Sequence, residues 1–279
     1  MATKSKTLWA PKRRIEQAYR KAIQAALKSL SESLTNLEDV EEILSRIRSF
    51  TYDPKFMEYA NAEALKMVTH LFSDSGKTWR QAARTNSRGR LIYQALQKEL
   101  QGPIGADLRF QAERNASLIK SLPLDIAKQV NEHVLREAMK GTRSSEIAQQ
   151  IKEFFPEASQ AKANLIARTE VSKTSTALTR ARCHFVGADW YVWRTSEDSR
   201  VRSSHEIMDG VIVKWSNPPS PESLDGETRT NGYYHAGEIF NCRCYAEPVI
   251  DLDLITWPAK VYHGGRMQRM TRKQFEKIV

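Results

Sequence analysis

The sequence predicts a mainly α-helical protein in which a long helical N-terminal region is followed by a small α+β C-terminal domain. Over the first 140 residues or so, apolar residues recur at spacings of three and four, the pattern of helices with one buried face. After Gly141 the pattern changes, and short stretches rich in aromatic and β-branched residues alternate with polar loops. The 279 residues suffice for two domains with their own cores. We therefore predict a helical region over 1–140, an α+β domain over 141–258 and a basic tail over 259–279.

The first half is predicted to consist of consecutive helices. The segment "IEQAYRKAIQAALKSL" places its apolar residues on one stripe, and the helix after it has Asn36 as a candidate N-cap and acidic residues in its first turn. Pro54 opens a third helix, because proline fits the first helical turn. Gly76 separates this helix from a fourth, and two further amphipathic segments are divided at Pro123. This half is expected to be a packing scaffold.

The second half is predicted to combine helices with a small sheet. Its strands are indicated by aromatic and β-branched runs such as "ADWYVWRT" and "VIVKW", and a loop rich in Pro, Ser, Gly and Asn lies between the last two. The predicted elements are a short helix from Ser144, a long helix ending at Gly187, strands within 188–195, 211–215 and 238–250, and a terminal helix at 270–279.

Composition and charge exclude several classes of protein. No run of about 18 apolar residues occurs, so no membrane span is expected. The N-terminus has no apolar signal core, and three cysteines do not make a disulfide framework, so we expect a cytosolic product. The net charge of +10 is concentrated at the two ends. These ends are either solvated or in contact with DNA or an acidic partner surface, and the candidate contact residues are Lys12, Arg13, Arg14, Arg266, Arg269, Arg272 and Lys273.

Charged and polar side chains cluster in the loops of the second half. Arginine forms forked pairs with carboxylates, so the charges of the long helix can pair with Asp198, Arg200 or Arg202 across the sheet. We favour a buried polar network that fixes the fold, and we expect no catalytic residue. Its predicted members are Arg168, Thr169, Glu170, Asp198, Arg200, Arg202, His205, Asp209, Glu238, Asn241 and Arg243.

A structural zinc site is an alternative for part of this cluster. Cys242 and Cys244, with one or two of His205, His235 and Cys183, offer the ligands that tetrahedral zinc prefers. A Cys-x-Cys pair is less diagnostic than Cys-x-x-Cys, and no second cysteine pair occurs. Without a metal, the two cysteines are small buried residues at the entry to a strand.

Two enzymatic alternatives use the same loops. In the first, a DNA-binding or metal-dependent nuclease-like module has His205 as base and Asp198 or Asp209 on a metal, although no paired-carboxylate signature is present. In the second, Glu170 or Glu238 is the acid of a nucleotidyl or ADP-ribosyl transfer site, although no glycine-rich phosphate loop is present.

The ordered motifs in the second half resemble the head morphogenesis domain of the Mu F-like minor head proteins of phages. The resemblance covers roughly 140–250, whereas the helical first half carries no motif of this kind. The matching positions are Arg168, Thr169 and Glu170, then Asp198, Arg200, Arg202, His205, Asp209 and Gly210, then Gly237, Glu238, Asn241, Cys242, Arg243 and Cys244.

The resemblance implies a minor capsid protein of a tailed phage or prophage, and no enzymatic activity follows from it. We expect no enzyme and no cofactor, with zinc as the alternative described above. It implies the portal, scaffold and major capsid proteins as partners during procapsid assembly, with double-stranded DNA as a further contact of the basic ends. It also implies a place in the virion, in the head interior or at the portal vertex, after assembly in the host cytoplasm. In this context the helical region 1–140 is expected to dock on the portal or capsid.

Overall fold

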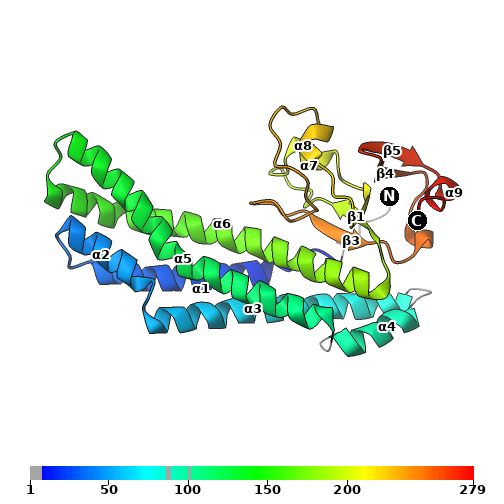
Figure 1. Cartoon of the computed structure of the whole chain (residues 1–279), viewed down its shortest axis with the longest axis horizontal. Coiled ribbons are helices and arrows are strands. Elements are labelled where there is room, and N and C mark those ends of the chain that lie inside the picture. Colours follow the sequence, from blue (N-terminus) through cyan, green and yellow to red (C-terminus); the bar gives the residue numbers. More distant parts are fainter. Residues whose placement is uncertain (1–7, 86–88, 100–101) are drawn as a thin grey trace. The chain divides into compact units, whose positions relative to one another are not determined.

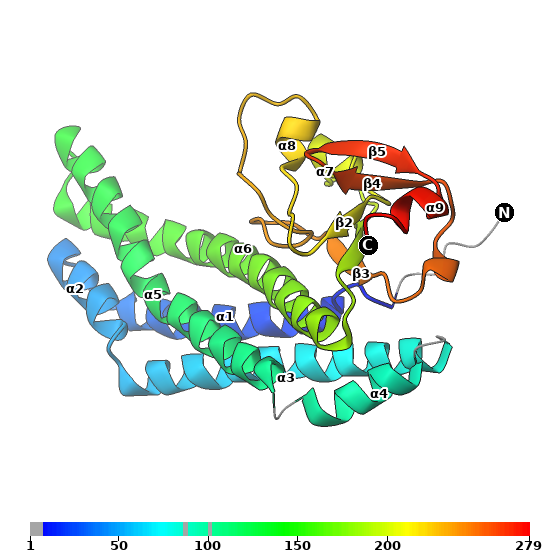
Figure 2. The ribbon, with the colours of Figure 1, turned by 45° about the vertical axis from the view of Figure 1, so that its right-hand side comes forward.

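The computed structural model describes residues 8–85, 89–99 and 102–279. The chain divides into two compact units: one contains residues 13–68 and 110–167, and the other contains residues up to Lys12 with 69–109 and 168–279. Figure 1 shows the elements coloured along the chain, and Figure 2 shows them from a second direction. We call them the helical unit and the sheet unit. No helix in the described ranges is long and apolar enough to cross a membrane.

The helical unit is built from amphipathic helices whose apolar faces meet. On α1, the buried residues recur every three or four positions, so one stripe faces the other helices. Tyr19 of this helix donates a hydrogen bond to Oδ1 of Asn115 at 3.3 Å, and Tyr59 donates to the carbonyl of Ala22 at 3.0 Å. The helices of the chain that contribute to this unit are α1 (Arg13–Leu34), α2 (Val40–Phe50), α3 (Pro54–Thr85), α5 (Pro103–Met139) and α6 (Ser144–Val186).

Three predicted helix breaks are absent, and one predicted cap is displaced. Helix α3 continues through Gly76, α5 through Pro123 and α6 through Pro156. A proline removes one backbone hydrogen bond, but Leu122 and Phe155, which directly precede the two prolines, are buried, so packing holds the helix together. Helix α2 begins after Asp39, whose side chain caps it, rather than after Asn36. Pro54 opens α3 as predicted.

The sheet unit contains one five-stranded sheet with strand order β3-β1-β2-β4-β5. All neighbours are antiparallel except β2 and β4, which are parallel with Ile212 opposite Val261. The strands are β1 (Trp190–Arg194), β2 (Ile212–Lys214), β3 (Tyr245–Pro248), β4 (Ala259–His263) and β5 (Arg266–Met270). The smaller helices are α4 (Gly89–Lys98), α7 (Ser203–Glu206), α8 (Pro221–Leu224), η2 (Leu252–Leu254) and α9 (Arg272–Phe275).

The basic C-terminal segment, expected to be a tail, is part of the sheet. Residues 259–279 supply β4, β5 and the one-turn helix α9, which Thr271 and Gln274 close with a reciprocal capping box. Val261 and Phe275 are fully buried, which explains why this segment is ordered despite its charge. The helix predicted at 270–279 is therefore the end of β5 followed by a single turn.

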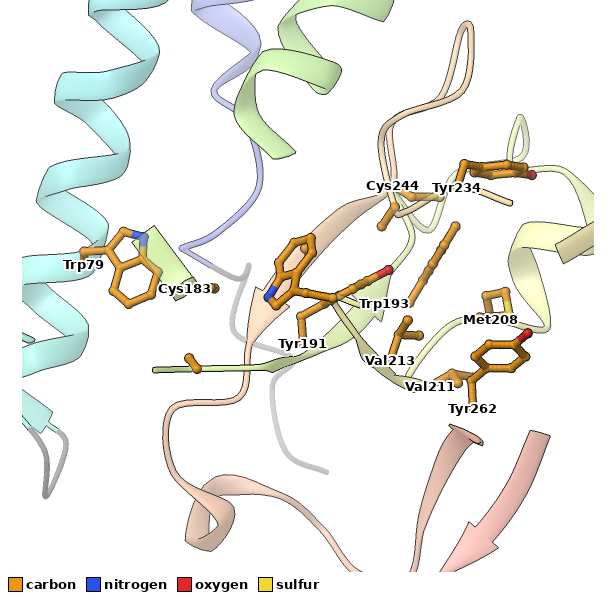
Figure 3. Close-up of a cluster of buried hydrophobic side chains, with 14 of the residues drawn as sticks. Trp79, Cys183, Tyr191, Trp193, Met208, Val211, Val213, Tyr234, Cys244 and Tyr262 are labelled. Carbon is orange, nitrogen blue, oxygen red and sulfur yellow. The ribbon is translucent and has the colours of Figure 1, made fainter. Parts of the chain in front are cut away.

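Both faces of β1 are buried, which accounts for its unusual aromatic content. Tyr191 and Trp193 lie in one hydrophobic cluster, shown in Figure 3, whereas Trp190 and Val192 lie in a second cluster on the opposite face. The first cluster also contains Trp79 of α3 and Cys183 of α6, so helices and sheet share one core within this unit. The predicted fold class, mainly α with a small α+β C-terminal region, is confirmed.

A buried ion pair joins α6 to the end of α4. Arg182 donates from Nε and Nη2 to the two carboxylate oxygens of Glu99, at 2.7 and 3.2 Å. Its Nη2 also donates to the carbonyl of Phe72 at 3.0 Å, and its guanidinium lies 4.6 Å from the centre of the Phe72 ring. Arg182 is 1% exposed and Glu99 is 5% exposed, so the pair is fully desolvated.

Candidate functional site

One face of helix α6 holds the loop that carries Cys242 and Cys244. Side chains at 168, 169, 172 and 176 share that face, because positions three or four residues apart on a helix are neighbours. Each makes a hydrogen bond to the loop that precedes β3. The bonds are Arg168 Nη1 to Asn241 Oδ1 at 2.9 Å, Asn241 N to Thr169 Oγ1 at 2.9 Å, Ser172 Oγ to Cys242 O at 2.8 Å, and Thr176 Oγ1 to Ala236 O at 2.7 Å.

The loop approaches the helix so closely that it requires glycine at position 237. Gly237 has a φ of +86°, a backbone conformation that residues with a Cβ atom rarely adopt. A Cβ there would lie 2.7 Å from Thr176 Oγ1 and 2.9 Å from the carbonyl oxygen of Cys244. Asn241 also has a positive φ of 59°, a conformation that asparagine tolerates better than most residues. The Gly-Glu and Asn-Cys-Arg-Cys motifs therefore have a steric role in the backbone.

His205 lies between the two cysteines. Its Nδ1 is 3.6 Å from Sγ of Cys242 and 3.4 Å from Sγ of Cys244. All three side chains are buried, and their candidate ligand atoms lie within 4.8 Å of one another. The amide of Cys244 also donates to Sγ of Cys242 at 3.3 Å. Trp193 of β1 meets the His205 ring edge to face, with ring centres 5.6 Å apart, and fixes the ring plane.

A hydrogen-bond chain on the far side of His205 determines which of its two ring nitrogens carries a proton. Tyr234 donates to Oε1 of Glu222 at 2.7 Å, and Asn231 donates to the same oxygen at 2.6 Å. Since the tyrosine proton points to the carboxylate, the phenolic oxygen accepts from Nε2 of His205, which is 3.0 Å away. The ring is then protonated at Nε2, and the lone pair of Nδ1 points to the two sulfur atoms. The tautomer is thus inferred from the network.

The two thiols have opposite pKa shifts. The hydrogen bond between them lowers the pKa of Cys242 well below its ordinary value, against the effect of burial, and His205 lowers it further. The same hydrogen bond, followed by burial, raises the pKa of Cys244 far above its ordinary range. The first proton of the pair is therefore lost more readily than that of an ordinary thiol, and the second is retained more strongly.

Of the two residues behind His205 in this hydrogen-bond chain, Glu222 is charged and Tyr234 is neutral. Burial raises the pKa of Glu222, but the hydrogen bonds from Tyr234 and Asn231 outweigh it, so the net shift is downward. Burial and then Glu222 raise the pKa of Tyr234. The carboxylate is therefore ionised and the tyrosine keeps its proton.

Asp198, a member of the predicted polar network, makes its contacts near the surface. Asp198 pairs with Arg243 at 2.7 Å and accepts the amide of Arg200, whose side chain is exposed. Arg243, a partner of Asp198, thus lies on the loop before β3, whereas the sequence had suggested a partner on the long helix. The Arg243 and Asp198 side chains are 26% and 37% exposed, so this pair lies near the surface rather than in the core.

The other predicted network residues have their own local partners. Arg202 donates to the carbonyl of Phe240 at 3.0 Å, and its guanidinium lies 4.9 Å from the centre of that ring. Asp209 accepts from the amide and hydroxyl of Thr195, and Glu238 accepts from the amide of His235 at 2.7 Å. Glu170, buried on α6, lies 3.8 Å from the ammonium of Lys173.

His235 is buried apart from the cysteine cluster. Its Nδ1 is 3.1 Å from the hydroxyl of Tyr191, and its ring packs against Trp215 with ring centres 5.1 Å apart. Burial, followed by the positive charge of Arg180, lowers the pKa of His235 to about 4. His235 and Cys183, both considered as zinc ligands, lie outside the only group of three or more His, Cys, Asp or Glu residues with metal-binding geometry in the described part of the chain.

Residues 128–247 match the model of a family described as phage Mu protein F like protein. This segment is a phage Mu F-like domain. An uncharacterized protein of Haemophilus influenzae (strain KW20 / Rd) is 31% identical over 245 residues, which cover 81% of this chain and 52% of the relative. The chain spans about half the length of that curated relative. No solved structure matches the chain.

The phage Mu F-like domain contains every motif described above. It runs from the last part of α5 through α6 and the first two strands to β3, so Arg168, His205 and both cysteines of the cluster lie inside it. Strands β4 and β5 lie beyond its C-terminal limit, although β4 pairs with β2 in the same sheet. The resemblance noted in the sequence is therefore confirmed.

Four residues of the site were not singled out from the sequence. Ser172 and Thr176 carry a usable signal, since they continue the spacing of four residues from Arg168 on the predicted long helix. Tyr234 and Glu222 carry none, because they lie in a loop without periodicity and meet His205 only through the tertiary fold.

The basic residues predicted as contacts are divided between the two units. Arg13 and Arg14 open α1 in the helical unit, whereas Arg266 and Arg269 lie exposed on the edge strand β5 of the sheet unit. Arg272 forms ion pairs with Asp253 and Glu276, which offset its charge. Lys273 is exposed, and Lys12 is half-buried.

Proposed function

We propose that this chain is a minor head protein that takes part in the assembly of a phage head. The match of residues 128–247 to the phage Mu F-like family is the observation that carries the proposal. The polar residues of the motifs support it, because their contacts fix the backbone: Arg168 and Thr169 bind Asn241, and Asp198 binds Arg243. This is what a domain selected for a rigid docking surface requires.

We further propose binding partners and a location in the phage head. The chain acts at the portal vertex or in the head interior and binds the portal, scaffold or major capsid proteins. The arginines of β5 support contact with an acidic protein surface or with packaged DNA, because Arg266 and Arg269 are exposed on an edge strand.

The test is co-purification of the full chain with head proteins of the phage or prophage that encodes it. Tagged chain is expressed with portal, scaffold and major capsid protein, and retention is measured by quantitative mass spectrometry. We expect portal protein to be retained at a fixed ratio. A folded chain that retains none of the three, and whose deletion leaves the yield of filled heads unchanged, would contradict the proposal.

Contact with DNA is measured separately. If Arg266 and Arg269 of β5 bind phosphates, the DNA-binding constant falls steeply as the salt concentration rises. The double substitution Arg266→Gln with Arg269→Gln should then reduce the steepness of log binding constant against log salt concentration by about 2 for duplex DNA. Lys128→Gln, in the helical unit, is the control for loss of one positive charge elsewhere. Binding that does not respond to salt would exclude this contact.

The geometry does not favour the nuclease-like alternative. His205 is surrounded by two cysteines and Tyr234, while Asp198 is paired with Arg243 and Asp209 caps Thr195. Neither aspartate belongs to the group of candidate ligands around His205 in the described residues. A catalytic metal held by these aspartates would first have to break both contacts.

A further inference from the structure

We propose that His205, Cys242 and Cys244 bind a zinc ion, with Tyr234 and Glu222 as the outer partners that orient the histidine. The proposal concerns a metal site and is independent of the role in head assembly. It stands on the distances between ligand atoms, on the direction of the histidine lone pair and on the burial of the cluster.

The distances fit a tetrahedral zinc ion. Zinc bonds of about 2.3 Å to sulfur and about 2.05 Å to nitrogen, at the tetrahedral angle, place the nitrogen and each sulfur about 3.6 Å apart. The observed distances from Nδ1 of His205 are 3.6 Å to Cys242 and 3.4 Å to Cys244. The two nitrogen-to-sulfur distances would therefore need to change by only tenths of an ångström to hold an ion.

The histidine presents the correct atom. Metal-binding histidines usually donate their second ring N–H to a carboxylate or another acceptor, which fixes the ring and makes the ligating nitrogen more basic. Here Nε2 donates to Tyr234, which in turn donates to Glu222. The chain leaves Nδ1 without a proton and directed at both sulfur atoms.

Electrostatics favour the ion over an empty cluster. His205 is 2% exposed, and Cys242 and Cys244 are each 3% exposed. Two thiolates buried without a counter-charge are strongly disfavoured, whereas a divalent ion with two thiolates and a neutral imidazole has no net charge. Soft sulfur and imidazole ligands select zinc rather than magnesium or calcium, which prefer oxygen.

Hydrogen bonds within the protein hold the backbone and the sulfur of Cys242 in place. Ser172 fixes the carbonyl of Cys242, and the amide of Cys244 donates to Sγ of Cys242, a bond that stabilises thiolate sulfur. The described residues supply three ligands, so the fourth zinc position is left for water or for a group from a partner.

The first experiment measures metal content of the full chain. The protein is purified under reducing conditions without chelator and analysed by elemental mass spectrometry, alongside Cys242→Ala, Cys244→Ala and the matched control Cys183→Ala, another buried cysteine. We expect one zinc per chain in the wild type and in Cys183→Ala. In Cys242→Ala and Cys244→Ala we expect the zinc content to be at least tenfold lower. His205→Gln should lose zinc in the same way, whereas its matched control His235→Gln, outside the cluster, should keep it.

The second experiment keeps the test valid if the ligand variants do not fold. Cobalt is exchanged into the wild-type chain, and Glu222→Gln is titrated with zinc in competition with a coloured chelator. We expect thiolate-to-cobalt absorption with tetrahedral d–d bands, and zinc affinity about 10–100-fold weaker in the variant. A folded wild-type chain without stoichiometric zinc even after zinc is added, or cobalt bound without thiolate absorption, would overturn the proposal. A disulfide between Cys242 and Cys244 in the reduced preparation would overturn it too.

Discussion

Replacing Arg182 by methionine should strongly destabilise the sheet unit. The substitution removes both hydrogen bonds to Glu99 and the one to the Phe72 carbonyl, and it leaves a carboxylate that is 5% exposed without its cation. Breaking a buried ion pair in this way costs about 3–5 kcal/mol. Replacing both residues, as Arg182→Met with Glu99→Leu, removes the desolvated charges together, so the double variant should lie within about 1 kcal/mol of the wild type.

The assay is urea unfolding of the four proteins of this cycle, followed by tryptophan fluorescence. All six tryptophans of the chain lie in the residues of the sheet unit, so the signal reports the unit that contains the pair. We expect a coupling free energy of about 3 kcal/mol or more between the two positions. Additive effects of the two single substitutions would refute the reasoning, because they would show that the two charges are not coupled in the folded state.

Three further substitutions test the site. Gly237→Ala should destabilise the sheet unit by more than the roughly 1–2 kcal/mol of an unfavourable φ, whereas Gly226→Ala, at φ +81° with open space, should cost only that amount in thermal unfolding. Equal losses would refute the close approach to Thr176. Asp198→Ala should cost about 1 kcal/mol or less in the same assay, since the pair with Arg243 is partly exposed. Burial lowers the pKa of His235 from 6.5 to about 4, so the unfolded chain takes up the proton first as the pH falls. The free energy of unfolding should therefore decrease between pH 6.5 and 4 by about 3 kcal/mol more in the wild type than in His235→Gln, and parallel pH profiles would contradict this.

The fold class could be predicted because it depends on local periodicity. The apolar stripe of α1 and the aromatic run of β1 are visible in the sequence and determine which faces are buried. The continuity of α5 and α6 could not be predicted, because Pro123 and Pro156 are local breakers that packing between distant segments overrides. The placement of β4 and β5 in the sheet likewise depends on a parallel pairing with a strand far away in sequence.

The candidate site could be predicted only as a list of residue types. Residue chemistry made His205, Cys242 and Cys244 candidate ligands, and the structure brings them together. It also made His235 a candidate, and only the fold separates a histidine facing Tyr191 from one facing two sulfurs. The charged residues were expected to form one network because residue types alone show which charges are opposite, and not which residues meet. The partners that Asp198 and Arg202 find depend on loop geometry that no sequence spacing encodes.

The spacing of the side chains on α6 has a consequence for insertions and deletions. Each residue added to a helix rotates everything beyond it by about 100°, so one extra residue between Thr169 and Ser172 would move Ser172 and Thr176 off the face that binds the loop. The exposed segment 225–230 has no such constraint, and its length can change without moving the cysteines. Homologous domains should therefore vary freely in length in that segment and keep a fixed residue count from Arg168 to Thr176.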